Sequence, residues 1–230
     1  MVNYNGKSRA IWSTHPIEKP YLIYQIGSAD PELAVKAAKT VMNDVSGIDL
    51  NCGCPKPFST SGGMGAALLT NPDLLCSILT ALRNAMPPEI CVSAKIRLLP
   101  TQEDTLKLVE RIVNTGVSAL TVHCRTRNMR KTEKATVERL REIVEFVEKM
   151  GKGVAVIENG DCLGYEDAKR VREVTGQFRF LSVIMCQSIL HRCSFRYDRH
   201  RCGGQSLMFL SNTIGRCASD ICSGISPCSE

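Results

Sequence analysis

The stretch that decides the fold is Gly47-Ile48-Asp49-Leu50-Asn51-Cys52-Gly53-Cys54-Pro55. Ile48 and Leu50 are apolar residues typical of a buried strand, and the glycine and proline around Cys54 favour a turn that ends this strand. Cys54 is therefore expected at the carboxyl end of a strand, where α/β folds carry their functional groups. A thiol at such a place can act as a nucleophile, a metal ligand or a proton donor.

The same unit of strand, short loop and amphipathic helix repeats from residue 21 to residue 185. The predicted strands are 21–25, 47–51, 91–97, 118–123, 154–157 and 180–185, and the predicted helices begin near Asp30-Pro31, Asn71-Pro72, Thr101, Val137 and Tyr165. Mostly continuous apolar runs indicate strands buried on both faces, as in a parallel sheet. The alternation fits either an open doubly wound sheet or part of a (β/α)8 barrel.

Polar or charged side chains end almost every predicted strand. They are Gln25, Asn51, Lys95, Arg97, His123, Arg125 and Asn159. The carboxyl ends of parallel strands share one face, and in a barrel they converge on a common axis. Convergence of this many polar side chains favours the barrel, so the sequence predicts an α/β fold with an incomplete TIM (β/α)8 barrel.

The composition is that of an ordinary globular chain. Of 230 residues 43% are hydrophobic and 23% charged, and the net charge of +6 is compatible with a phosphate-rich partner. The polar N-terminus and the lack of a long apolar run predict no signal peptide, no membrane partner and a cytoplasmic, possibly also nuclear, location. Six of the twelve cysteines lie beyond residue 185, in a Cys/Ser-rich segment (186–230) expected to form no regular element. Disulfides and a zinc site are not expected, because no pair of cysteine motifs has metal-ligand spacing.

Each candidate residue has a functional and a structural interpretation. Cys54 is predicted to donate a proton, although most free cysteines are small buried hydrophobes. Lys95 and Arg97 alternate with apolar residues, and a lysine within a core strand is costly unless it meets an anion or a polar partner. His123 is either a satisfied core histidine or a contact for an anion or a cofactor. The glycine-rich segment 59–67 is either a mobile substrate loop beside Cys54 or a flexible connector.

Taken together, these motifs resemble the tRNA-dihydrouridine synthases, in particular the fungal-like members that act on uridine 20. The resemblance runs from about Trp12 to Val183. It is carried by Tyr24-Gln25-Ile26-Gly27, by the Gly47–Pro55 stretch, by Gly62-Gly63-Met64-Gly65-Ala66-Ala67-Leu68-Leu69, by Lys95-Ile96-Arg97-Leu98-Leu99, by Val122-His123-Cys124-Arg125 and by Asn159-Gly160-Asp161.

This resemblance implies an FMN-dependent barrel that reduces the C5–C6 double bond of uridine in the tRNA D-loop with NADPH. FMN contacts are then expected from Gln25, Lys95, His123, Asn159, Gly160 and Asp161. Cys54 is expected to donate a proton to C5 while the reduced flavin delivers a hydride to C6. Asn51, Arg97 and Arg125 are expected to contact the substrate, with Arg127 and Arg130 as further phosphate contacts, and no metal is expected.

The resemblance also implies that the chain carries barrel strands three to eight. Residues 1–185 are then a partial FMN-binding catalytic domain, truncated at its N-terminus, and 186–230 are an unrelated tail. Such a chain is expected to bind FMN poorly by itself and to leave its first and last barrel strands as open edges. Two alternatives remain: a flavin barrel that reduces free pyrimidines, or an RNA-binding fragment without catalytic activity.

Overall fold

The structure is a computed structural model. It describes residues 2–5, 10–130, 132–162, 164–176, 181–182 and 208–213, and of 2–5, 10–11, 181–182 and 208–213 it describes only the backbone. Its centre is a seven-stranded sheet of order β8-β7-β6-β5-β4-β3-β9. The strands are β3 (Leu22–Gly27), β4 (Gly47–Asn51), β5 (Cys91–Leu98), β6 (Ala119–Thr126), β7 (Ala155–Asn159), β8 (Leu181–Ser182) and β9 (Met208–Thr213). Strands β3 to β8 pair in parallel, each with its neighbour along the chain.

Helices connect these strands, as the sequence predicts. The α-helices are α1 (Pro31–Val41), α2 (Pro57–Thr60), α3 (Pro72–Ala85), α4 (Gln102–Asn114), α5 (Glu138–Lys149) and α6 (Tyr165–Thr175). The 3-10 helices are η1 (Pro16–Tyr21), η2 (Met42–Asp44) and η3 (Gly65–Thr70). Three of the predicted helix starts are capped, because Asp30, Asn71 and Thr101 each accept a hydrogen bond from a backbone N–H of the first turn.

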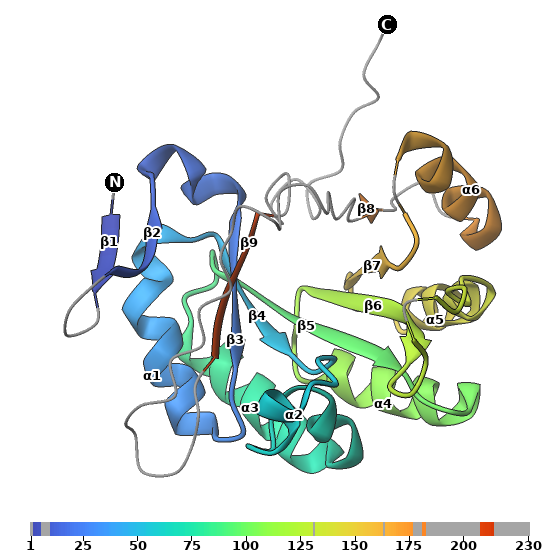
Figure 1. The fold of residues 1–230 in the computed structure, drawn as a ribbon, viewed down its shortest axis with the longest axis horizontal. Coiled ribbons are helices and arrows are strands. Elements are labelled where there is room, and N and C mark those ends of the chain that lie inside the picture. Colours follow the sequence, from blue (N-terminus) through green and yellow to red (C-terminus); the bar gives the residue numbers. More distant parts are fainter. Residues whose placement is uncertain are drawn as a thin grey trace, which may run out of the picture.

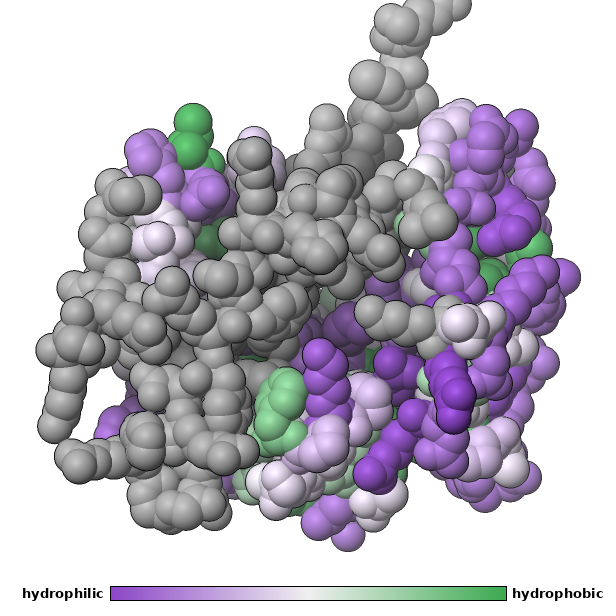
Figure 2. Space-filling model, viewed as in Figure 1, coloured by the Kyte–Doolittle hydropathy of each residue, from purple (hydrophilic) through white to green (hydrophobic). Residues whose placement is uncertain are grey.

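The long helices surround the outer side of the curved sheet (Figure 1). The strand residues that face them are apolar and fully buried, for example Leu50, Ile96 and Val122. The amphipathic helices leave their polar faces to solvent, and Figure 2 shows a mainly hydrophilic surface over α5 and α6. The parallel sheet with helices along one side is the arrangement of an incomplete (β/α)8 barrel, as the sequence predicts.

The inner face of the sheet differs from the outer one. Its side chains are buried but polar, among them Gln25, Asp49, Ser93, Thr121 and Asn159. Strands β4, β5 and β6 therefore alternate between apolar residues facing the helices and polar residues facing the barrel interior. In β7 the pattern is broken, because Ile157 lies level with Thr121 and the buried Glu158 level with Val122. The sequence predicts burial of both faces correctly, but not this polarity.

Two features of the fold were not predicted. A hairpin of β1 (Val2–Asn5) and β2 (Ala10–Thr14) precedes the sheet, and the ring of Trp12 packs edge-on against Tyr24 with 4.6 Å between ring centroids. Strand β9 lies in the segment expected to hold no regular element, and it pairs antiparallel with β3 over Leu22–Gly27. The backbone of β3 is therefore paired on both sides, so the expectation of an open edge there was wrong. The rest of 186–230 lies outside the described residues.

Candidate functional site

Four polar side chains form one buried network at the centre of the inner face. Gln25 Nε2 donates to Asp49 Oδ2 at 2.6 Å, and Ser93 Oγ donates to Asp49 Oδ1 at 2.6 Å. Asn51 Nδ2 donates to Gln25 Oε1 at 3.0 Å. Burial raises the pKa of Asp49, and the hydrogen bonds from Gln25 and Ser93 oppose this rise. The network joins β3, β4 and β5 directly below the turn that carries Cys54.

The turn after β4 is held on both of its sides. Asn51 Oδ1 accepts hydrogen bonds from the backbone N–H groups of Gly53 at 3.1 Å and Cys54 at 3.0 Å. From β5, Arg97 Nε donates to the carbonyl oxygen of Gly53 at 2.7 Å. Cys54 is half-buried, whereas the thiol of Cys52 is fully buried and points toward the carbonyl of Leu50. Of the two thiols at this turn, that of Cys54 is therefore the one placed to meet a substrate.

The glycine-rich segment packs against this turn. The backbone N–H of Ala66 donates to the carbonyl oxygen of Cys54 at 2.9 Å, and that of Met64 donates to the carbonyl of Ser59 at 3.1 Å. A Cβ atom added to Gly65 would lie 2.7 Å from the carbonyl oxygen of Cys54. The predicted position beside Cys54 is confirmed, and the segment acts as a wall of the turn.

Lys95 and Asn159 meet across the sheet. Lys95 Nζ donates to Asn159 Oδ1 at 2.8 Å, which joins the ends of β5 and β7. Burial lowers the pKa of Lys95 from 10.5 to about 8, and the negative charge of Asp49 opposes this shift. An ammonium group in such a place gains an interaction when an anion binds beside it.

His123 and Asp161 are joined by Arg125. The guanidinium of Arg125 contacts His123 Nε2 at 3.3 Å, Asp161 Oδ1 at 2.5 Å and the carbonyl of Glu133 at 2.7 Å. Since a guanidinium only donates, His123 Nε2 must accept, and the proton of the neutral ring is on Nδ1. Burial, together with the nearby cations Lys95, Arg97 and Arg125, lowers the pKa of His123 from 6.5 to about 3. His123 is therefore a neutral ring with an N–H donor to offer.

The loop after β7 is locked in an unusual conformation. Asp161 has a φ of +57°, and a Cβ atom on Gly160, whose φ is +146°, would come within 3.0 Å of Ala135 Cβ. The second oxygen of Asp161 accepts from the backbone N–H of Ala135 at 2.7 Å. Burial pulls the pKa of Asp161 upward, but the bonds from Arg125 and Ala135 more than offset this and hold it below its usual value. A loop held in this way presents a fixed surface to a ligand.

The shifted pKa of His123 predicts a pH-dependent stability. The unfolded chain takes up a proton near pH 6.5 and the folded chain only near pH 3, so stability is fully present above pH 6.5 and falls as the pH is lowered toward 3. The slope from this one proton approaches about 1.4 kcal/mol per pH unit. Urea unfolding of wild type and His123→Asn between pH 6.5 and 4.5 measures it, since the subtraction cancels all other groups. Equal slopes in the two proteins would contradict the buried neutral histidine.

The structure brings most of the predicted site residues together and places two of the predicted arginines on an exposed loop. The network and contacts above bring together Gln25, Asn51, Cys54, Lys95, Arg97, His123, Arg125, Asn159, Gly160 and Asp161 at the carboxyl edge of the sheet. Arg97 and Arg125 use several of their donors on protein groups: Arg97 also donates to the carbonyl of Thr126 at 3.1 Å, and Arg125 is only 6% exposed. Arg127 and Arg130 are exposed on the following loop.

Sequence reasoning missed Asp49, Ser93 and the packing of Gly65. A signal for the first two existed, because Asp49 and Asn51 lie two residues apart within an otherwise apolar strand, as do Ser93 and Lys95. Residues two apart share a face of a strand. The contact of Gly65 with Cys54 had no such local signal.

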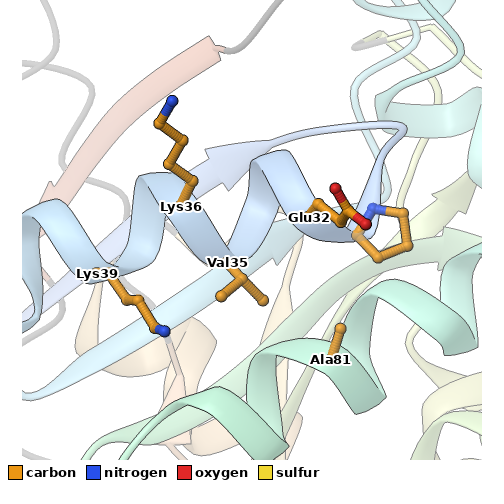
Figure 3. A pocket seen from close by; sticks show the side chains of 6 residues that line it. Glu32, Val35, Lys36, Lys39 and Ala81 are labelled. Atoms are coloured by element: carbon orange, nitrogen blue, oxygen red, sulfur yellow. The ribbon is translucent and has the colours of Figure 1, made fainter.

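A shallow groove lies elsewhere, between α1 and α3 on the outer helical layer (Figure 3). Its walls are Pro31, Glu32, Val35, Lys36, Lys39 and Ala81. Val35 points toward α3, whereas Lys36 points away from it. This groove contains none of the convergent polar groups of the inner face, so the carboxyl edge of the sheet is the better candidate site. Within the described residues, no helix is long and apolar enough to cross a membrane.

Comparisons with known proteins show the family of the chain. A family model described as dihydrouridine synthase matches residues 2–185. The tRNA-dihydrouridine(20) synthase [NAD(P)+] of Schizosaccharomyces pombe is 57% identical over 171 residues, which cover 74% of this chain and 35% of that protein. The Saccharomyces cerevisiae protein of the same name is 49% identical over 153 residues, which cover 65% of this chain and 39% of that protein. The chain thus spans little more than a third of the length of these relatives.

Among solved structures, the chain is similar in fold to a 2,3-dimethylmalate lyase of the PEP mutase/isocitrate lyase superfamily. The TM-score is 0.50, with 14% sequence identity over 83% of this chain and 69% of that one. At this identity the likeness concerns the fold alone.

Proposed function

Because the chain belongs to the dihydrouridine synthase family, we propose that its site carries the FMN-dependent reduction of uridine to 5,6-dihydrouridine in tRNA, with NADPH as the source of electrons. The names of the two yeast relatives make position 20 of the D-loop the proposed target. The observation that carries the proposal is the meeting of Cys54, Lys95 and His123 at one edge of the sheet. Lys95 bonds to Asn159 at the end of β7, and it lies close enough to Cys54 and His123 for their charges to act on one another. Cys54 and His123 are held by Asn51 and Arg125 from their own strands.

The inner face has the donors that a flavin needs. Lys95 offers an ammonium group that donates to the side-chain oxygen of Asn159, a neutral acceptor. His123 offers its Nδ1–H, and the loop after β7 is held in one conformation by the bonds of Asp161 with Arg125 and Ala135. These groups suit a flavin ring whose reduced form carries negative charge, and a phosphate on the loop. Lys95, His123, Gln25 and the Asn159–Asp161 loop would hold FMN, which when bound supplies the hydride.

Cys54 is proposed as the proton donor. Reduction of the C5–C6 bond needs a hydride at C6 and a proton at C5, and the thiol of Cys54 gives its proton to C5 and regains one from water. The turn is fixed by Asn51 on one side and Arg97 on the other, so that the thiol is presented with little loss of entropy. Asn51 is proposed to help position the uracil ring as well.

The substrate must bring a single base into the barrel interior. A uridine stacked in the D-loop cannot reach the inner face, so it must leave its stack, at a cost of a few kcal/mol. Exposed Arg127 and Arg130 lie on the loop after β6 at the same edge, where they can neutralise phosphates and so offset that cost. A positive net charge of +6 favours the approach of RNA.

The proposal predicts that Lys95 governs flavin affinity. Replacing Lys95 with glutamine removes a buried charge-assisted contact, and such contacts contribute about 1.5–3 kcal/mol, so we expect FMN to bind roughly ten- to a hundredfold more weakly at pH 7. Because the pKa of Lys95 is about 8, the affinity of the wild type should also fall as the pH rises through 8, whereas that of the variant should not. Quenching of flavin fluorescence during titration with the chain measures both.

The exposed Lys36 on α1 provides the matched control, and Lys36→Gln should bind FMN as the wild type does. Equal loss in both variants would mean that general charge, and not the site, attracts the flavin. The activity itself is tested by supplying FMN, NADPH and unmodified tRNA and measuring dihydrouridine by mass spectrometry. Reduction of free uridine but not of tRNA would favour a reductase of free pyrimidines instead.

A further inference from the structure

The chain contains a hydrogen-bond relay that runs from the buried pair of Ser93 and Asp49 to the Cys54 turn. Its members are Ser93, Asp49, Gln25, Asn51 and the backbone N–H groups of Gly53 and Cys54. The four side chains are each at most 6% exposed, so water does not substitute for their partners.

The direction of this relay follows from the chemistry of its two ends. The backbone N–H groups of Gly53 and Cys54 can only donate, so the side chain of Asn51 must present its oxygen to them. The amide nitrogen of Asn51 then faces Gln25, which must accept through Oε1 and donate through Nε2. A group that accepts is therefore required at the far end, and the carboxylate of Asp49 provides it at 2.6 Å.

We infer that Asp49 is a positioning residue: through Gln25 and Asn51 it sets the orientation of two side-chain amides and thereby holds the turn that presents Cys54. The inference rests on the proposed function for the meaning of Cys54, but not for the relay itself. The side-chain hydrogen bonds of Asp49 go to Gln25 and Ser93 and not to the thiol of Cys54. Its effect on the turn is therefore transmitted through the relay. Ser93 supports it, because the hydroxyl can either donate to or accept from position 49.

The relay predicts that two isosteric changes compensate each other. In Asn51→Asp the new carboxylate still accepts from the Gly53 and Cys54 N–H groups, but it requires a donor from Gln25. Gln25 must then turn its oxygen toward the carboxylate of Asp49, which places two acceptors against each other. Changing Asp49→Asn as well supplies the missing donor, so the double variant carries a complete relay that runs in the opposite direction, with its net charge unchanged.

Asp49→Asn alone should change little in the turn. The new amide keeps its oxygen toward Gln25 and turns its nitrogen toward Ser93 Oγ, which accepts. Asn71→Asp is a matched control, because Asn71 also accepts a backbone N–H, that of Leu74, but at an exposed helix cap where aspartate serves equally well.

The experiment measures amide hydrogen exchange of the peptide that contains Gly53 and Cys54, and the rate at which iodoacetamide alkylates Cys54, in the full chain without flavin or tRNA. Neither measurement depends on activity, so a failure of the proposed function leaves it intact. We expect Asn51→Asp to speed exchange of this peptide at least tenfold, and the double variant to return to within about threefold of the wild type. The alkylation rate should follow the same order. A double variant as fast as, or faster than, Asn51→Asp would overturn the inference, as would a change of similar size in Asn71→Asp.

Discussion

Replacement of Cys54 by alanine is expected to lower the rate of dihydrouridine formation by roughly 10²–10⁴-fold, which is the usual contribution of a positioned general acid. The thiol is the one half-buried acidic group on a turn that Asn51 and Arg97 both hold. Without this thiol, C5 of the uracil must take its proton from water, and the site restricts the access of water. The measurement is the single-turnover yield of dihydrouridine in tRNA at excess protein.

Flavin affinity provides the necessary comparison, because Cys54→Ala removes no group proposed to hold FMN. Titration with FMN should therefore give the same dissociation constant as for the wild type. Cys52→Ala is the matched control for the loss of a thiol, since Cys52 is fully buried and directed toward the carbonyl of Leu50. Equal rates for the wild type and Cys54→Ala, or equal losses in both cysteine variants, would disprove the assignment of the proton donor.

The second large effect is expected at Gly65, where alanine should destabilise the chain by about 2–5 kcal/mol. The backbone there has a φ of +57°, and a Cβ atom would lie 2.3 Å from Ser59 Oγ and 2.7 Å from the carbonyl oxygen of Cys54. The left-handed conformation costs a side chain about 1–2 kcal/mol, and forcing atoms into a packed site costs about 1–3 kcal/mol more. Because the carbonyl belongs to the turn itself, the clash should also displace Cys54.

Gly151 separates these two costs. Its φ of +64° is nearly the same as that of Gly65, but no atom lies within 4 Å of an added Cβ. Gly151→Ala should therefore lose only the conformational part, about 1–2 kcal/mol. Urea unfolding measures both variants, and alkylation of Cys54 should change only in Gly65→Ala. Similar losses in the two variants would mean that the glycine-rich segment does not support the turn.

The sequence allowed much of the site to be predicted, because strand ends in a parallel sheet share an edge. Gln25 and Asn51 end predicted strands, and Lys95 and Asn159 lie within two residues of a predicted strand end. The structure joins them through the contacts Asn51–Gln25 and Lys95–Asn159. The roles of Arg97 and Arg125 were harder to predict. Their positions at the edge followed from the strand pattern, but whether a guanidinium reaches a ligand or a neighbouring carbonyl depends on atoms far away in the chain.

Local spacing by itself determined the order of strands and helices, the capped helix starts and the place of Cys54 just after β4. These properties depend on residues within one or two turns of each other, so the sequence contains all that they require. The tertiary structure alone decided the polarity of the relay, the tautomer of His123 and the contact of Gly65 with Cys54. Each of these depends on partners brought together by the sheet, 24 residues apart for Gln25 and Asp49 and 64 for Lys95 and Asn159. The pairing of β9 with β3 also depends on distant partners, because the open hydrogen bonds of a sheet edge pair with whichever strand the fold brings there.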